Sequence, residues 1–240
     1  MNQFRELFTD IFQKNGLEQY IQDDIIAKFS ELTDIMIATN AVMNITALTT
    51  VEKIIPLHYA DCAKVAEFIP QGARVADIGC GGGFPILPLA IIRPDLHLVG
   101  IDSTDKKIKY VQNTAHHFGL NVQAISGRAE DLTKMAEHRD AYDIVVSRAV
   151  ARLNVLDELC IPFVQVGGKF IAMKGAAGQE ELDEARNGIQ KLGGEINMAK
   201  EYGLYTGETD EKRVLIEIKK IKITPKEYPR GFGAIKKKPL

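Results

Sequence analysis

Apolar residues recur at helical spacing through the first part of the chain. One face is formed by Phe4, Leu7, Phe8, Ile11 and Phe12, which follow the i, i+3, i+4, i+7, i+8 order of an amphipathic helix. A second stripe predicts a helix over about 23–39 and comprises Ile25, Phe29, Leu32 and Met36. A third helical pattern covers roughly 51–68, after a loop over 40–50. Residues 1–70 are therefore predicted to form an N-terminal helical extension.

From residue 74 onward, short apolar runs alternate with helical segments. The predicted strands are 74–78, 97–101, 122–126, 142–147, 168–173, 196–205 and 212–221. The predicted helices are 85–92, 104–118, 129–136, 152–164 and 178–192. This alternation favours an α/β fold whose sheet is mostly parallel, with helices on both faces. The last two strands are too close in sequence for a helical crossover, so we expect an antiparallel C-terminal hairpin.

Composition narrows the class of protein. The 240 residues are 45% hydrophobic and 26% charged, as in an ordinary globular protein. No apolar stretch approaches the roughly 20 residues that span a bilayer, and the N-terminus lacks the apolar core of a secretory signal. We therefore expect a cytoplasmic protein with no membrane partner. Cys62, Cys80 and Cys160 are far apart and form no CxxC pair, which argues against disulfides and a structural zinc site, so no metal is expected.

The charge is distributed unevenly along the chain. The net charge is −2, but residues 212–240 contain ten Lys/Arg and only two Glu. A basic C-terminal segment can mark a polyanionic partner. A solvated strand followed by a solvated tail explains the same charge equally well. Charge alone therefore leaves both interpretations open.

The most informative motif follows the first predicted strand. It reads D-I-G-C-G-G-G-F over residues 77–84. Glycines at this point let the backbone turn tightly and approach a ligand, and Pro85 suits the first turn of the next helix. Asp102 ends the second strand, where a carboxylate can accept hydrogen bonds from both hydroxyls of a ribose. The sequence therefore predicts a nucleoside pocket.

The identity of residue 84 separates two kinds of nucleoside pocket. The dinucleotide fingerprint G-x-G-x-x-G requires a third glycine where this chain has Phe84. The D-x-G-x-G-x-G pattern instead resembles motif I of class I S-adenosylmethionine-dependent methyltransferases. That resemblance implies a Rossmann-like sheet over residues 71–225, followed by a basic tail over 226–240.

Topology adds further candidates, because ligands bind beyond the carboxyl ends of parallel strands. The loop 127–131 follows the third strand and is placed to hold an adenine ring. Arg148 ends the fourth strand, where its guanidinium would lie near the cofactor carboxylate or the substrate. The alternative for Arg148 is a surface ion pair with Asp143 or Asp102.

Motifs along nearly the whole chain resemble one family. They are Asn44–Ala47, His58 with Asp61, residues 77–90, Asp102-Ser103 with Lys106-Lys107, Arg128–Glu130, Ser147–Ala151 and Lys174-Gly175. Together they resemble the bacterial small-subunit ribosomal RNA guanine-N7 methyltransferases, historically called glucose-inhibited division protein B. The resemblance implies methylation of guanine N7 in 16S rRNA, within a ribosomal particle, with S-adenosylmethionine as cofactor. Residues 229–236 depart from the family's usual C-terminal pattern.

Two sets of site residues follow. The expected cofactor contacts are Gly79, Gly81, Phe84, Asp102, Ser103, Ala129, Glu130 and Arg148. The candidates for contacts with RNA are Arg148, Lys174, Arg230, Lys236, Lys237 and Lys238.

The chemistry calls for few catalytic groups. Guanine N7 has a free lone pair and is unprotonated at neutral pH, so it can attack the sulfonium methyl in line without a general base. No catalytic residue can be named from the sequence, and a structural role is the favoured interpretation of His58. Two other functions stay open: methylation of a protein or small molecule, and binding of the cofactor without catalysis.

Overall fold

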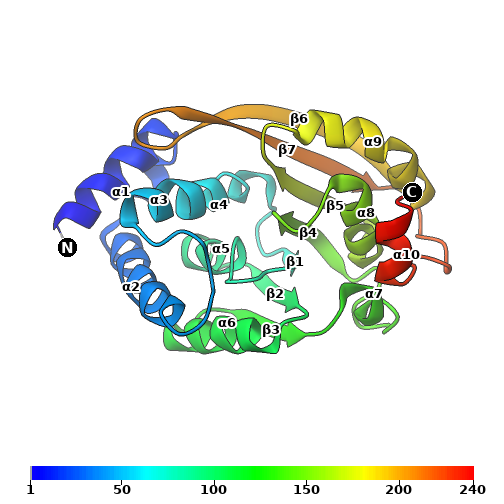
Figure 1. Cartoon of the computed structure of the whole chain (residues 1–240), viewed down its shortest axis with the longest axis horizontal. Coiled ribbons are helices and arrows are strands. Elements are labelled where there is room, and N and C mark those ends of the chain that lie inside the picture. The colour runs from blue at the N-terminus through cyan, green and yellow to red at the C-terminus, as the bar shows by residue number, and fades with distance from the viewer. Residues whose placement is uncertain (1) are drawn as a thin grey trace.

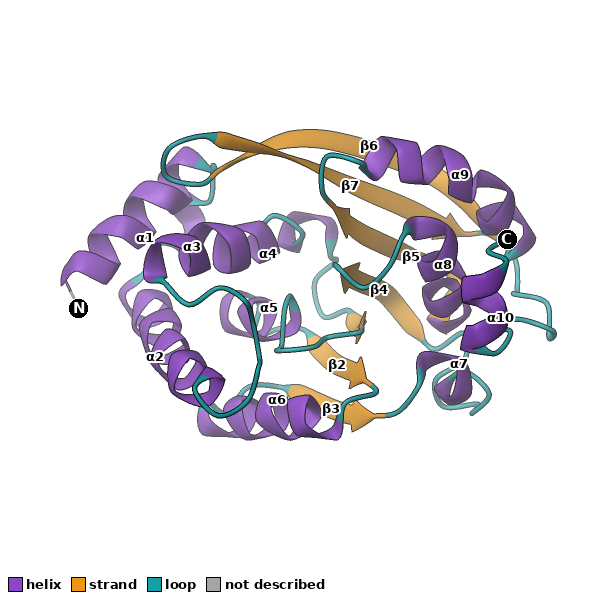
Figure 2. Ribbon diagram, in the orientation of Figure 1, coloured by secondary structure: helices purple, strands orange, loops and turns teal. Residues whose placement is uncertain are grey.

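The computed structural model describes residues 2–240 and is built around one seven-stranded sheet (Figures 1 and 2). The strand order is β3-β2-β1-β4-β5-β7-β6. The strands are β1 Arg74–Ile78, β2 His97–Asp102, β3 Val122–Ser126, β4 Tyr142–Arg148, β5 Val164–Lys174, β6 Gly194–Tyr205 and β7 Asp210–Lys220. The first five pair in parallel, and β7 pairs antiparallel with both β5 and β6. The expected parallel sheet with an antiparallel C-terminal hairpin is confirmed.

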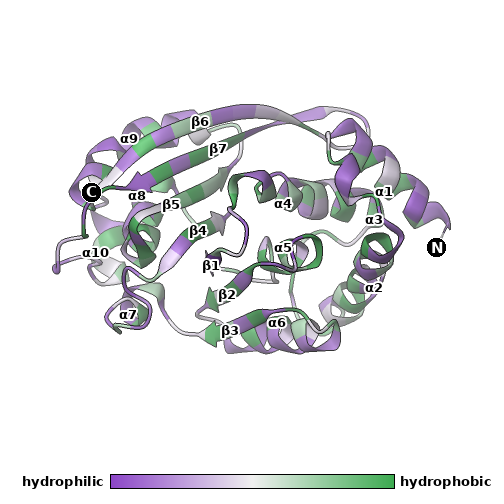
Figure 3. Cartoon of the chain, turned by 180° about the vertical axis from the view of Figure 1, so that it is seen from behind, coloured by the Kyte–Doolittle hydropathy of each residue, from purple (hydrophilic) through white to green (hydrophobic). Residues whose placement is uncertain are grey.

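Helices cover both faces of the sheet because strand side chains alternate between two cores. One core joins the sheet to α1 Asn2–Lys14, α2 Asp23–Asn40, α5 Ile86–Ile92 and α6 Asp105–His117. The other joins it to α8 Leu153–Cys160, α9 Gly178–Lys191 and α10 Phe232–Lys237, with the short α7 Ala129–Leu132 at its edge. Helix α5 is buried along its whole length and is mostly green in Figure 3.

The predicted third helix, 51–68, is wrong as a single α-helix. The chain there forms α3 Val51–Ile54, a π-helical segment Ile55–Ala60, α4 Asp61–Ala63 and a 3-10 turn Ala66–Phe68. Pro56 has no N–H to donate to the preceding turn, which disfavours a regular α-helical ladder here. The helix predicted over 152–164 likewise ends at Cys160, and Pro162 lies in the 3-10 turn that follows.

The β6–β7 hairpin extends beyond the sheet to the N-terminal helices, as Figure 1 shows. Asn15 fixes its tip, because the side-chain amide donates to the Tyr205 carbonyl at 3.0 Å and accepts from the Tyr205 N–H at 3.0 Å. The N-terminal extension is thus tied to the sheet by a shared core and by the hairpin. Within residues 2–240, no helix combines the length and apolar character needed to cross a membrane.

Candidate active site

The site lies at the carboxyl ends of β1 and β4, which are neighbours in the sheet. From β1 the chain moves outward through β2 and β3, and it then returns to β4 and continues in the other direction to β5. Ligands of open α/β sheets bind where the strand order reverses in this way. The glycine loop after β1 and the loop Ala149–Ala151 after β4 both meet at this point.

The glycine loop is packed too tightly for side chains. Gly79 has φ of 74°, in the region that favours glycine, and a Cβ there would lie 2.4 Å from Val150 Cγ2. A Cβ on Gly82 would lie 2.9 Å from the Ile45 carbonyl oxygen. The loop therefore presents bare backbone to the adjoining clefts. Pro85 precedes the first residue of α5 rather than lying inside its first turn, a small correction to the expected position.

Asp102 connects the loop to the end of β2. Its Oδ2 accepts from the Gly81 N–H at 3.0 Å and its Oδ1 accepts from the Thr104 N–H at 2.8 Å. The carboxylate is half-buried, and each oxygen has a further lone pair for a ligand. This geometry suits the predicted contact with ribose hydroxyls.

Two clefts open on either side of Gly79, Asp102 and Val150. The first, of about 150 Å³, has the acceptors and apolar surface suited to adenosine and is called the adenosine cleft below; its lining includes Ser103, Gly127, Ala129, Glu130, Leu159 and Phe232. The second, of about 350 Å³, is called the loop cleft below; its lining includes Thr46, His58, Gly81, Phe84, Lys107 and Arg148. All eight predicted cofactor residues therefore lie on these two clefts.

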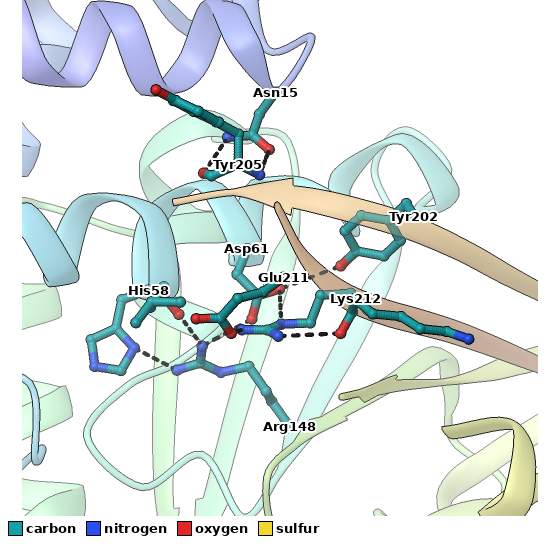
Figure 4. Close-up of polar contacts among 10 residues, drawn as sticks. Asn15, His58, Asp61, Arg148, Tyr202, Tyr205, Glu211 and Lys212 are labelled. Carbon is teal, nitrogen blue, oxygen red and sulfur yellow. Dashed lines mark hydrogen bonds and ion pairs between the residues drawn. The ribbon is translucent and has the colours of Figure 1, made fainter. Parts of the chain in front are cut away.

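Arg148 is held in a buried network, shown in Figure 4. Its Nη1 donates to the Leu57 carbonyl at 2.8 Å and to Asp61 Oδ2 at 3.1 Å. The alternative interpretation of Arg148, an ion pair with Asp143 or Asp102, is wrong, since the partner is Asp61. Asp61 Oδ1 also lies 3.5 Å from Arg213 Nε and accepts from the Tyr202 hydroxyl at 3.3 Å, so it joins the N-terminal extension to the hairpin.

The same guanidinium fixes the tautomer of His58. Arg148 Nη2 lies 2.8 Å from His58 Nδ1 and can only donate, so Nδ1 is the acceptor. Burial and the neighbouring Arg148 charge lower the pKa of His58 to about 3, so the ring is neutral and its proton is on Nε2. That proton is donated to Thr46 Oγ1 at 2.8 Å.

This arrangement leaves the Thr46 hydroxyl proton free for a ligand. Thr46 Oγ1 accepts from His58 and also from the Leu48 N–H at 3.0 Å, so both lone pairs are occupied. The remaining O–H belongs to a residue that lines the loop cleft. His58 also stacks on Phe84, with ring centroids 4.0 Å apart. His58 therefore has the structural role favoured from the sequence, and it also lies at the cleft.

Asp77 is a buried carboxyl group at the start of the glycine loop. It is 1% exposed; its Oδ2 accepts from the Ile86 N–H at 3.2 Å, and its Oδ1 has no partner. Burial raises the pKa of Asp77 to about 7. Asp102 and Thr46 line the clefts and offer acceptors and a donor to a ligand, whereas Asp77 lines neither cleft. Its unpartnered oxygen lies in the strand that leads directly into the glycine loop.

The predicted RNA residues fall into two groups. Lys174 has a side chain 6% exposed, paired with Glu181 at 2.8 Å and donating to the Ala151 carbonyl. Arg230 makes a bidentate pair with the fully buried Glu158. Both cations are therefore engaged within the protein, which argues against direct phosphate contacts in this conformation. Lys236, Lys237 and Lys238 are exposed on or just after α10 and have no ion-pair partner among residues 2–240.

Several lining residues were not assigned to a site from the sequence, among them Thr46, Lys107, Val150 and Phe232. The first three belong to segments that matched the family motifs. The motif match pointed to these segments but did not indicate what each of the three residues contacts. Phe232 lies in the divergent tail, and nothing in the sequence pairs it with residues 101–130. Its position depends on how the tail folds back.

Comparisons with known proteins agree with this geometry. A family model described as rRNA small subunit methyltransferase G matches residues 25–205. The chain is 40% identical over 240 residues to the Ribosomal RNA small subunit methyltransferase G of Clostridium novyi, covering 98% of each protein. It is 39% identical over 239 residues to the protein of that name from Brevibacillus brevis, covering 98% of this chain and 99% of the relative.

Solved structures share the fold at low sequence identity. M. jannaschii TYW2, solved in complex with AdoMet, aligns with a TM-score of 0.54 and 16% identity over 75% of this chain and 80% of that one. P. horikoshii TYW2, solved in complex with MeSAdo, aligns with a TM-score of 0.56 and 13% identity over 75% of this chain and 66% of that one. The chain therefore shares its fold with these two structures. The full-length sequence match shows that the chain belongs to the rRNA small subunit methyltransferase G family.

Proposed function

We propose that this protein transfers the methyl group of S-adenosylmethionine to N7 of a guanine in 16S rRNA of the small ribosomal subunit. The substrate class rests on the full-length family match. The observation that carries the chemistry is the state of His58, because its one lone pair accepts from Arg148 and its proton is donated to Thr46. The histidine at the cleft therefore cannot take a proton from a substrate, which suits a nucleophile that has none to lose.

Each of the two clefts would hold a different part of the cofactor, the adenosine cleft its adenosine and the loop cleft its methionine part. Asp102, Ala129 and Glu130 would hold the adenosine, with the Asp102 carboxylate accepting from the ribose. Thr46 and Lys107 would face the methionine carboxylate, and Asp77 would attract the ammonium. When bound, S-adenosylmethionine supplies an electrophilic methyl group on its sulfonium.

A third cleft is suited to the guanine. It has a volume of about 520 Å³, adjoins the loop cleft through Arg148, Ala149 and Val150, and is lined further by Met173, Lys174 and Gly175. N7 lies in the deep groove of an RNA helix that side chains cannot read, so the target base must be exposed to enter. Holding N7 in line with the methyl group would supply most of the catalysis, since positioning contributes up to roughly 7–11 kcal/mol in ideal cases.

The decisive test offers the protein labelled S-adenosylmethionine with either naked 16S rRNA or immature small-subunit particles. Nucleoside analysis should find the label in 7-methylguanosine, and comparing the two substrates shows which one is used. Label in protein or in another nucleoside would replace the proposed reaction with a different methylation. Cofactor binding with no transfer to either substrate would favour a non-catalytic role.

The exposed lysines of the tail should contribute to RNA affinity. Replacing Lys236, Lys237 and Lys238 by Ala should weaken RNA binding, and each lost phosphate contact should lower the slope of log affinity against log salt by about 0.7–0.9. Cofactor affinity should stay unchanged, because Phe232 and Arg230 are retained. Filter binding at several salt concentrations measures the slope. The same slope in the native and triple-variant proteins would remove these lysines from the RNA interface.

Asp77 should make cofactor binding depend on pH. With a pKa of about 7, the ligand-free carboxyl is mostly protonated at pH 6 and mostly ionised at pH 8. A cationic ligand binds the ionised form, so S-adenosylmethionine affinity should rise by about tenfold between these pH values. Calorimetry on the native protein and Asp77→Asn checks this, because titration of the cofactor itself is common to both. A native pH profile no steeper than that of Asp77→Asn would contradict the assignment.

A further inference from the structure

The C-terminal segment forms part of the adenosine cleft. Phe232, the first residue of α10, lines the cleft together with Asp102, Ser103, Ala129 and Glu130. Asp102 and Ser103 are at the carboxyl end of β2, and Ala129 and Glu130 begin α7 after β3, so all four precede Phe232 by more than a hundred positions. Phe232 is half-buried, and the Arg128 guanidinium lies over its ring at 5.5 Å from the centroid. An aromatic side chain is thus delivered to the cleft by a segment outside the sheet.

A buried clamp holds this segment in place. Arg230 donates from Nη2 to Glu158 Oε2 at 2.6 Å and from Nε to Oε1 at 3.0 Å, and its backbone N–H donates to Oε1 at 2.7 Å. Glu158 is 0% exposed, so loss of Arg230 would leave a buried carboxyl group without its ion-pair partner. Leu159, the next residue of α8, lines the same cleft as Phe232. The clamp and the cleft wall are therefore adjacent positions on one helix.

Two more contacts fix the tail on either side of the clamp. Arg139 donates from Nη1 to the Tyr228 carbonyl at 2.9 Å and from Nη2 to the Thr224 carbonyl at 2.9 Å. Beyond the clamp, Ile235 is fully buried in the core that contains α8 and α9. Phe232 therefore lies between two anchored points, which limits its freedom before a ligand binds.

We propose that Phe232 is a cofactor-contact residue, held by the Arg230–Glu158 clamp against the adenine ring of S-adenosylmethionine. This inference rests on the proposed function and extends its cofactor site into the part of the chain that departs most from the family pattern. The occupant is adenine rather than an RNA base because the cleft also holds Asp102 and Glu130, acceptors suited to a ribose and to an exocyclic amine. An aromatic contact of this kind increases affinity for any ligand that carries the adenine.

The first test compares Phe232→Ala with Ala234→Ser, which changes an exposed residue of the same helix. Loss of an aromatic–base contact should weaken S-adenosylhomocysteine and 5′-methylthioadenosine by the same factor, about tenfold, because both carry the adenine. Ala234→Ser should bind both as the native protein does. Phe232→Leu, which keeps most of the buried apolar volume, should fall between them.

The possible results separate the two proposals. Absence of binding by the native protein would overturn the proposed function. Native binding with equal affinity in Phe232→Ala would overturn only the role of Phe232. If Phe232→Ala binds RNA more weakly but binds the adenine ligands with unchanged affinity, Phe232 contacts RNA instead of the cofactor. That result would also overturn the proposed role of Phe232.

Limited proteolysis tests the same contact in the unaltered protein. Trypsin can cleave after Arg230 only when the tail leaves the Glu158 clamp. If the open form binds the cofactor about tenfold more weakly, saturating S-adenosylhomocysteine must lower the open population, and with it the cleavage rate, by the same factor. Phe232→Ala should show no such protection. Cleavage of the native protein at equal rates with and without ligand would refute the contact.

Discussion

Asp61→Ala should lower the free energy of unfolding by about 3–5 kcal/mol. Asp61 is 5% exposed and accepts from Arg148 at 3.1 Å, with Arg213 at 3.5 Å on its other oxygen. Removing the carboxylate leaves the largely buried Arg148 without an ion-pair partner among the described residues, whereas Arg213 keeps Glu211 at 2.9 Å. The desolvation of the Arg148 guanidinium is then uncompensated, which is the costly outcome of breaking a buried pair.

Glu67→Ala is the matched control for Asp61→Ala. Glu67 lies six residues further along the same segment and pairs with Lys200 of β6 at 3.3 Å, but both side chains are at least half exposed. Its loss should change stability by no more than about 0.5 kcal/mol. Urea unfolding of the three proteins measures the difference. Equal losses in both variants would show that the Asp61 network stabilises no more than a surface ion pair does.

The Asp61 network also shows where sequence reasoning reached its limit. The sheet was predictable because each strand is a short apolar run, a local signal that is repeated along the chain between helical segments. The partner of Arg148 was not, because Asp61 is 87 residues away and meets it only when the N-terminal extension packs on β4. The motif identified both residues, but their contact depends on tertiary packing.

Charge was the least reliable guide to the site. Arg230 and Lys174 belong to basic or motif-bearing segments, so both were candidates for RNA contacts. Their partners, Glu158 and Glu181, lie on α8 and α9, whose packing no local pattern reveals. The exposed lysines at the end of α10 lack such partners in the described chain, and they therefore remain the RNA candidates. By contrast, the glycine loop was predictable, because Gly79, Gly81 and Gly83 adopt positive φ values that favour glycine.

Gly79→Ala should weaken S-adenosylmethionine binding by at least about a hundredfold, because its methyl group would block the approach of the ligand to the loop backbone. It should also lower stability, for two reasons. Gly79 has φ of 74°, where a Cβ costs about 1–2 kcal/mol. The new methyl group would also lie 2.4 Å from Val150 Cγ2, and both Gly79 and Val150 line the adenosine cleft and the loop cleft. Calorimetry measures the affinity, and thermal unfolding measures the backbone strain.

Gly72→Ala isolates the strain from the steric conflict. Gly72 has φ of 69°, nearly that of Gly79, but no atom lies within 4 Å of the position that a Cβ would take there. It should lose stability through strain alone and bind the cofactor normally. Adding Val150→Ala to Gly79→Ala removes the clashing methyl groups, so stability should return to the Gly72→Ala level while cofactor affinity stays low. Recovery of affinity in that double variant would mean that Gly79 is needed to accommodate Val150 rather than to let the backbone approach the ligand.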